Sequence, residues 1–289
     1  GFRVWVKTGR PPLIFQQKSF SFVGGVSPMA DFSNDQTMEI SSALSASPVL
    51  VTGGSGFLAG HIIQRLLSAG YRVRATVQSF RESDKFAHLT KFKGALQRLE
   101  IVETQLQNRE SWTAAFKDGV EFVIHTACPY LSTPEDTQKQ IIDPMVEGMQ
   151  NILDQCLDHP SVKKLVITSC AVTVCDTFEQ DREYSERDWN ETSSIERRAH
   201  AYGKVLAEKK AFDFVKAIAS TRSKGCPFKV AAILPSVMLG PHLSGGISYS
   251  HELLLIFIEN RIRGILNCNF YVTDVRDAVT AHINALENS

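Results

Sequence analysis

The stretch that decides the fold reads Val49-Leu50-Val51-Thr52-Gly53-Gly54-Ser55-Gly56-Phe57-Leu58-Ala59-Gly60. A short strand pattern leads into glycines and then into an amphipathic helix pattern over 57–68. Gly53 permits a tight exit from the strand, Gly56 lets the backbone approach a pyrophosphate, and a small residue at 59 or 60 lets the helix pack on the strand. The free N–H groups of the helix then bind phosphate. With a second strand ending at Val77, the segment predicts a dinucleotide-binding βαβ unit of ~30 residues; a glycine turn with only a packing role is the alternative.

From Ser47 onward, short β-branched runs alternate with longer amphipathic stretches, which is typical of a parallel sheet with crossover helices. The predicted strands are Val49–Val51, Arg72–Val77, Leu99–Val102, Phe122–His125, Lys164–Thr168 and Lys229–Leu234. The predicted helices are Phe57–Ser68, Gln138–Leu157 and His200–Ala217. We therefore expect an α/β fold with a doubly wound parallel sheet in residues 48–241.

The two ends of the chain differ from this middle region. Residues 1–30 carry four basic side chains and no Asp or Glu, which suggests a disordered tail or upstream leader over 1–47. Residues 242–289 follow the last predicted strand and are treated as a separate C-terminal region.

Composition excludes several classes of protein. The 289 residues carry 31 basic and 31 acidic side chains, which does not suit a general nucleic-acid binder. The longest strong apolar run, Leu253–Ile258, is far shorter than the ~20 residues that span a bilayer, so no membrane partner is expected.

Six scattered cysteines form no CxxC pair and the histidines show no ligand spacing, so no metal is expected. Reduced thiols suit a cytoplasmic protein; organelle targeting by the leader is left open.

The end of the second predicted strand indicates which dinucleotide is bound. An acidic residue there would bind the ribose hydroxyls of NAD and repel a 2′-phosphate, but the segment 72–78 contains none. Arg74, Arg81 and Lys85 are candidate partners for a 2′-phosphate. NADP(H) is therefore favoured over NAD(H), with basic residues on a solvated face as the alternative reading.

Several further segments occur in a set order: the Thr52–Gly60 loop, Tyr71–Val77, Val123–Pro129, Pro144–Met149, Leu165–Ser169, Lys204–Glu208, Leu234-Pro235 with Gly240-Pro241, and Val272–Asp277. Together they resemble the extended short-chain dehydrogenase/reductases of the NAD-dependent epimerase/dehydratase superfamily, and among them the dihydroflavonol reductase and cinnamoyl-CoA reductase-like group. The resemblance implies a Rossmann fold that uses NADP(H) to interconvert a carbonyl and a secondary alcohol. It also implies that residues 242–289 form a small C-terminal substrate lobe, and that the chain ends before this lobe is complete.

The resemblance places the cofactor against a set of positions spread along the chain: Gly53, Gly56, Phe57, Leu58, Lys85, Gln105, Leu106, Ala127, Thr168, Lys204 and Pro235. Two positions depart from the family pattern. Gln78 stands where relatives that bind NADP(H) usually carry Arg, and Gln105 stands where an Asp usually meets the adenine.

The catalytic positions implied by the resemblance also depart from the pattern. Lys204 matches the family lysine, but His200 occupies the position of the proton-donating tyrosine four residues earlier. Cys170 replaces the serine, and a one-residue shift of the loop would make Ser169 the functional hydroxyl instead. Since Lys204 shares a helix face with His200, it should lower the imidazole pKa and weaken proton donation.

Three functions follow from these residues. The first is an NADP(H)-dependent oxidoreductase acting on a small-molecule carbonyl or alcohol, as a monomer or homodimer. The second is a catalytically degenerate NAD(P)-binding regulatory or scaffold protein, because the family Tyr and Ser are His200 and Cys170. The third is a sugar-nucleotide epimerase or dehydratase on the same fold.

Overall fold

The computed structural model describes residues 5–8, 47–129, 131, 133–177, 182–262, 264 and 271–287. Of the leader expected over 1–47, only residues 5–8 and 47 fall within this part. Residues Trp5–Thr8 form β1, whose backbone pairs antiparallel with Ala231–Leu234.

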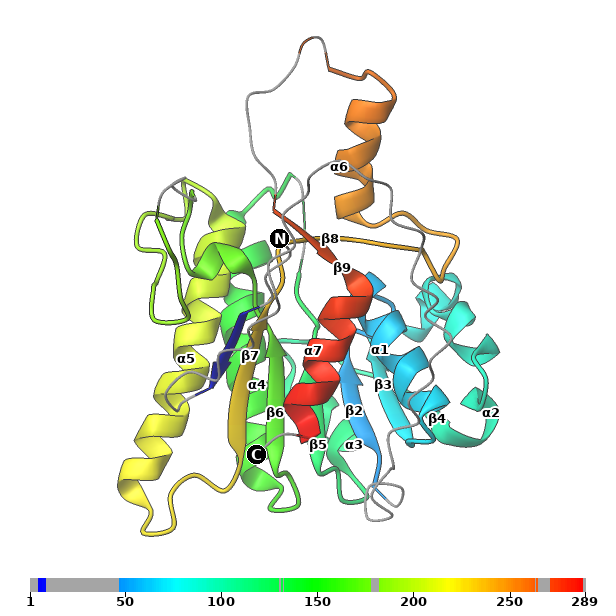
Figure 1. The fold of residues 1–289 in the computed structure, drawn as a ribbon. Coiled ribbons are helices and arrows are strands. Elements are labelled where there is room, and N and C mark those ends of the chain that lie inside the picture. The colour runs from blue at the N-terminus through cyan, green and yellow to red at the C-terminus, as the bar shows by residue number, and fades with distance from the viewer. Residues whose placement is uncertain are drawn as a thin grey trace.

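Six parallel strands form the centre of the molecule (Figure 1). Their spatial order is β4-β3-β2-β5-β6-β7, with β1 added beyond β7. This order reverses between β2 and β5, so the doubly wound parallel sheet is confirmed. The strands are β2 (Val49–Thr52), β3 (Val73–Val77), β4 (Leu99–Glu103), β5 (Phe122–His125), β6 (Lys164–Thr168) and β7 (Lys229–Leu234), within one residue at either end of those expected.

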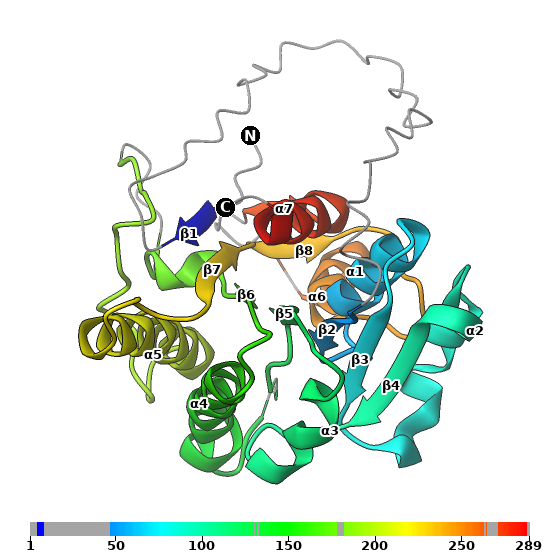
Figure 2. The ribbon, with the colours of Figure 1, turned by 90° about the horizontal axis from the view of Figure 1, so that it is seen from below.

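Helices cover both faces of the sheet (Figure 2). On one face lie α1 (Phe57–Ser68) and α7 (Val275–Glu287), whose buried side chains join those of β2 and β3 in one core cluster. On the other face lie α3 (Thr113–Phe116), α4 (Asp143–Asp158) and α5 (Ala199–Thr221), which form a second cluster with β5, β6 and β7. The two clusters are the two apolar layers that an alternating α/β sequence predicts.

Short turns of helix connect these elements: η2 (Phe80–Lys85), η3 (Ala87–Lys91), α2 (Ala95–Arg98), η4 (Arg109–Trp112), η6 (Ala171–Thr173), and a π-helical turn, η5 (Gln138–Ile142), that leads into α4. At Gly203 of α5, an added Cβ would approach Sδ of Met145 to 2.7 Å. The missing side chain therefore allows α4 and α5 to pack closely beside the site.

The C-terminal region contains a second, two-stranded parallel sheet of β8 (Val237–Leu239) and β9 (Val272–Asp274). Helix α6 (Tyr249–Ile258) projects beyond the main sheet (Figure 1). Helix α7, by contrast, packs beside α1 on the main sheet, although its residues fall in the range expected for the substrate lobe. The last helix is thus part of the core of the main sheet.

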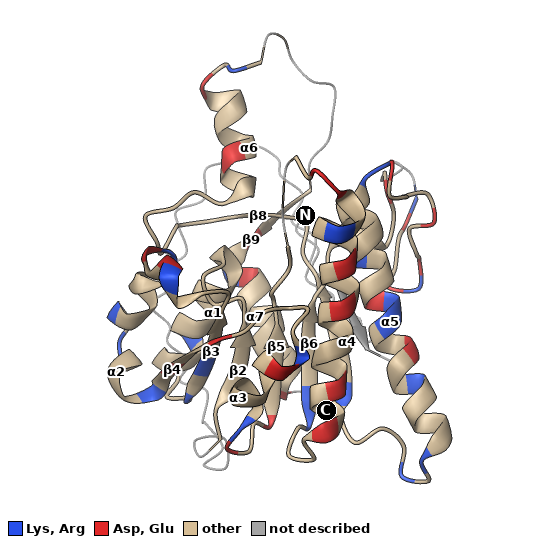
Figure 3. Cartoon of the chain, turned by 180° about the vertical axis from the view of Figure 1, so that it is seen from behind, with Lys and Arg blue, Asp and Glu red and all other residues tan. Residues whose placement is uncertain are grey.

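Acidic and basic residues are interspersed along the helices and loops of the described chain (Figure 3). Within the described part of the chain, no helix combines the length and the apolar character needed to cross a bilayer.

Candidate functional site

The glycine loop connects β2 to α1 at the carboxyl edge of the sheet. Gly53 has φ +69°, and a Cβ there would lie 2.9 Å from the Cα of Ala127. Its N–H donates to Oγ1 of Thr76 at 3.3 Å, and the N–H of Gly54 donates to the carbonyl of Thr76 at 2.7 Å. These contacts hold the loop between the ends of β3 and β5.

The start of α1 fits a phosphate group. Among the described residues, no side chain caps this helix at Gly56 and none of its first-turn residues is acidic. The N–H groups of the first turn therefore keep their hydrogen-bonding capacity and the positive end of the helix dipole. This is the cradle that a dinucleotide pyrophosphate requires.

Thr52 fixes the position of the neighbouring loop and was not singled out from the sequence. Its Oγ1 accepts from the backbone N–H groups of Thr126 and Ala127 at 3.1 and 3.0 Å, and lies 2.8 Å from Nδ1 of His125. Burial and then the Lys204 charge lower the pKa of His125 to about 3. His125 is therefore a neutral structural residue that helps to hold the Ala127 segment beside Gly53.

Arg81 and Lys85 lie on η2, directly after the end of β3, and both are exposed. Nζ of Lys85 pairs with Oε1 of Glu82 at 2.6 Å. Because the pair is solvent-exposed, it is worth at most about 1 kcal/mol and can be exchanged for a phosphate partner.

The structure contradicts the expectation for Arg74. Its guanidinium is 2% exposed, donates hydrogen bonds to Glu100, Asp118 and the carbonyls of Ala115 and Lys117, and forms ion pairs with Glu100 and Asp118. The reason is register: Arg74 lies mid-strand, directly opposite Glu100 on β4, rather than at the strand end where a nucleotide ribose would lie. Arg74 is a structural residue that ties β3 to β4 and to the end of α3.

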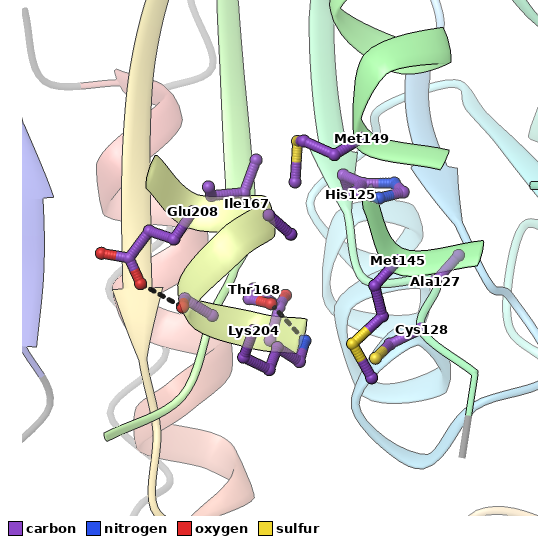
Figure 4. Close-up of a pocket in the computed structure, with 11 residues that line it drawn as sticks. His125, Ala127, Cys128, Met145, Met149, Ile167, Thr168, Lys204 and Glu208 are labelled. Atoms are coloured by element: carbon purple, nitrogen blue, oxygen red, sulfur yellow. Dashed lines mark hydrogen bonds between the residues drawn. The ribbon is translucent and has the colours of Figure 1, made fainter. Parts of the chain in front are cut away.

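A small cavity lies at the carboxyl ends of β5 and β6, between α4 and α5 (Figure 4). It is lined by His125, Ala127, Cys128, Met145, Met149, Ile167, Thr168, Ser169, Lys204, Ala207 and Glu208. Nζ of Lys204 donates to the carbonyl of Thr168 at 2.9 Å, which keeps the ammonium at the cavity. The predicted lysine is thus placed at the same sheet edge as the glycine loop.

His200 lies one helical turn before Lys204 on α5, as the spacing predicts. It is half-buried, and its Nε2 lies 3.9 Å from Sγ of Cys128. Burial first and the Lys204 charge second lower the pKa of His200 to about 4. At neutral pH its imidazole is uncharged, so it can accept a proton, although as a weaker base than an ordinary imidazole, and it is a scarce proton donor.

The two serine candidates have different surroundings. The Ser169 hydroxyl is buried and donates to the Glu208 carboxylate, which also accepts from the Thr173 hydroxyl at 2.7 Å. Cys170 immediately precedes η6 next to this network, and burial raises the pKa of its thiol. Ser169 therefore serves as a buried hydrogen-bond donor within the α5 side of the site, and Cys170 is a neutral thiol.

The remaining predicted cofactor positions are distributed around the same edge. Thr168 directs its hydroxyl to Nε2 of His282 at 2.8 Å, while its carbonyl faces Lys204. The carbonyl of Pro235 accepts from the N–H of Ala171, which joins the ends of β7 and β6. The other four are at the loop and at the end of β4: Leu58 is buried, Phe57 and Leu106 are half-buried, and Gln105 is exposed.

The fold and this site define a dinucleotide-binding α/β protein with a lysine-containing cavity at the switch point of its sheet. The chain belongs to the 3-beta hydroxysteroid dehydrogenase/isomerase family, whose model matches residues 50–249. The resemblance to the cinnamoyl-CoA reductase-like short-chain dehydrogenase/reductases is confirmed.

Three known proteins illustrate this kinship. A cinnamoyl-CoA reductase from Medicago truncatula is 30% identical over 258 residues, covering 86% of this chain and 75% of the relative. Tetraketide alpha-pyrone reductase 1 from Arabidopsis thaliana is 36% identical over 199 residues, covering 68% of this chain and 58% of the relative. The structure of Gre2 from Candida albicans in complex with NADPH is 28% identical with a TM-score of 0.68, covering 84% of this chain and 75% of that one.

Proposed function

We propose that the protein is an NADP(H)-dependent oxidoreductase that interconverts a carbonyl and an alcohol on a small organic molecule. The observation that carries this proposal is the placement of Lys204 at a cavity on the same sheet edge as the open N-terminus of α1. The NADPH complex of a relative with this fold supports the choice of cofactor. The named reductase relatives give no support to the alternative of a degenerate binding protein.

In this proposal three groups of residues bind different parts of the cofactor. The Gly53–Gly56 loop and the first turn of α1 hold the pyrophosphate, and Arg81 and Lys85 bind the 2′-phosphate. Lys204 orients the ribose at the cavity and stabilises negative charge on the substrate oxygen. When bound, the nicotinamide exchanges a hydride with the substrate carbon.

His200 moves the proton in this proposal. A carbonyl that accepts a hydride needs a proton on its oxygen, and an alcohol that gives up a hydride must lose one. Because the pKa of His200 is lowered to about 4, the neutral imidazole is ready to accept the proton of an alcohol at pH 7. Carbonyl reduction depends on the small imidazolium fraction.

The test is a fluorescence titration with NADPH followed by product analysis on a panel of aldehydes and ketones. We expect saturable binding and slow formation of alcohol by the wild type. The His200→Tyr/Cys170→Ser double variant, which restores the family residues, should form alcohol at least about 10-fold faster, since a missing general acid costs ~10²–10⁴-fold. Tight NADPH binding with no product until the double variant is made would overturn the proposal for the native protein.

A further inference from the structure

Cys128 lies between the cavity and His200. It follows β5 by three residues, is half-buried and lines the cavity, whereas His200 is not among the described residues that line it. Sγ of Cys128 lies 3.9 Å from Nε2 of His200 and 3.5 Å from the carbonyl of Pro129. The thiol is therefore within reach of both the imidazole and a molecule in the cavity.

This arrangement contains the parts of an activated nucleophile. A thiol attacks as its thiolate, so an adjacent proton acceptor increases its reactivity. Nε2 of His200 lies 3.9 Å from this sulfur, within reach of the thiol proton, and once protonated the imidazole stabilises the thiolate as an ion pair. The Lys204 ammonium, held by the Thr168 carbonyl, supplies a second positive charge at the cavity. Figure 4 shows Lys204 extending toward the side on which Cys128 and Met145 lie.

The other described cysteines lack this combination. Burial raises the pKa values of Cys156, Cys170 and Cys226, and it raises that of Cys175 to about 11. Of the described cysteines, Cys128 alone lines the cavity. Among these cysteines, reactivity should therefore be concentrated at Cys128.

We propose that Cys128 is a nucleophilic thiol that adds covalently to α,β-unsaturated carbonyl compounds entering the cavity. The thiol proton passes to Nε2 of His200 as the sulfur bonds to the β-carbon. The C=C electrons move to the carbonyl oxygen, where the Lys204 ammonium stabilises the enolate. His200 then returns the proton to the α-carbon, so that S–H is added across C=C and no oxidant or reductant is consumed.

The lining of the cavity favours this chemical class. Met145, Met149 and Ile167 offer apolar, polarisable contacts to a conjugated carbon chain. Lys204 offers a positive charge to its carbonyl oxygen, which becomes negative as sulfur adds. The proposal for Cys128 rests on the proposed function in one respect: both require that a carbonyl compound enters this cavity.

The test uses protein without dinucleotide and phenyl vinyl ketone as the probe, with intact mass and peptide mapping to follow each cysteine. We expect the adduct at Cys128 to form at least about 10-fold faster than at Cys226. Cys128→Ser should abolish this fast adduct, while the matched control Cys226→Ser should retain it. His200→Gln keeps the thiol but removes the proton acceptor, and should slow labelling of Cys128 at least about 10-fold. Circular dichroism of each variant verifies folding.

Equal labelling rates of Cys128 in the wild type and His200→Gln would overturn the proposal, as would faster labelling of Cys226. The same preparations are assayed for NADPH binding and alcohol formation, which separates the two proposals. If the wild type neither binds NADPH nor forms alcohol, but Cys128 is labelled rapidly in a His200-dependent way, the proposed function alone is overturned. Alcohol formation with an unreactive Cys128 would overturn the thiol proposal alone.

Discussion

At the scale of single residues, His200 is the residue that moves the proton in the proposed reaction. The sequence places His200 and Lys204 one turn apart and predicts a lowered imidazole pKa from the neighbouring charge. The structure adds that burial is the larger cause, which depends on packing across the site and cannot be deduced from spacing. The same limit applies to Cys128, which is 72 residues from His200 in sequence yet lies next to it.

The pH dependence of the reaction follows from this pKa. With the pKa of His200 lowered to about 4, each unit of pH above that value reduces the imidazolium fraction about tenfold. We expect kcat/KM for carbonyl reduction to fall about tenfold per pH unit between pH 5.5 and 8, while alcohol oxidation stays nearly constant. In His200→Tyr, whose phenol stays protonated over this range, reduction should lose this slope. A flat wild-type profile for reduction would exclude His200 as the proton donor.

Lys85 tests the cofactor preference. Lys85→Glu places a negative charge where the 2′-phosphate is expected and should weaken NADPH binding at least about 10-fold while affecting NADH much less. Lys91→Glu, an equal charge change at the exposed end of η3, serves as the control and should change both affinities little. Fluorescence titrations of the two nucleotides measure the effect, and equal losses of NADPH and NADH in Lys85→Glu would refute the contact.

At the scale of elements, the sequence predicts the strands correctly but not the register between them, and this register determines the role of Arg74. The hydrophobic pattern located all six parallel strands because buried strands read as continuous apolar runs. It did not reveal that Glu100 of β4 lies opposite Arg74 of β3, since pairing between strands is a tertiary property. The sequence therefore indicated a cofactor contact for Arg74, although ion pairs with Glu100 and Asp118 hold its buried guanidinium in place.

Arg74 should accordingly affect stability and not cofactor choice. Arg74→Met removes five donors and leaves the Ala115 carbonyl buried without this partner, which should cost about 3 kcal/mol of unfolding free energy. Arg72→Met changes an exposed arginine two residues earlier and should cost under about 0.5 kcal/mol. Urea unfolding measures both. If Arg74→Met is as stable as the wild type and no longer prefers NADPH to NADH, Arg74 is a partner of the 2′-phosphate and not a structural residue.

Gly53 tests the turn between β2 and α1. Gly53→Ala introduces a Cβ at φ +69° and 2.9 Å from Ala127. Gly225→Ala is a matched control, because Gly225 has φ +74° and open space around the added atom. We expect the control to cost about 1 kcal/mol and Gly53→Ala to cost at least about 1 kcal/mol more, with loss of NADPH binding. Equal unfolding free energies would show that close packing against Ala127 is unimportant.

At the scale of the whole molecule, the sheet brings together residues that the sequence separates widely. The order of strands places the ends of β2, β5 and β6 side by side, so the glycine loop, Cys128 and Lys204 meet at one edge. The βαβ pattern and the resemblance predicted this edge. They did not predict that α7 returns to the main sheet, where His282 accepts from the Thr168 hydroxyl, because a helix pattern does not identify the surface that it covers.

The central claim is that this edge transfers a hydride between a nicotinamide and a substrate carbonyl. The most direct measurement uses NADPH carrying deuterium at C4 of the nicotinamide, with mass spectrometry of the product from an aldehyde or ketone that the wild type consumes. The account predicts one deuterium on the carbinol carbon for one of the two C4 epimers of the nucleotide, and loss of this transfer in Lys204→Ala. Saturable NADPH binding without deuterium in any product, from either epimer, would contradict it.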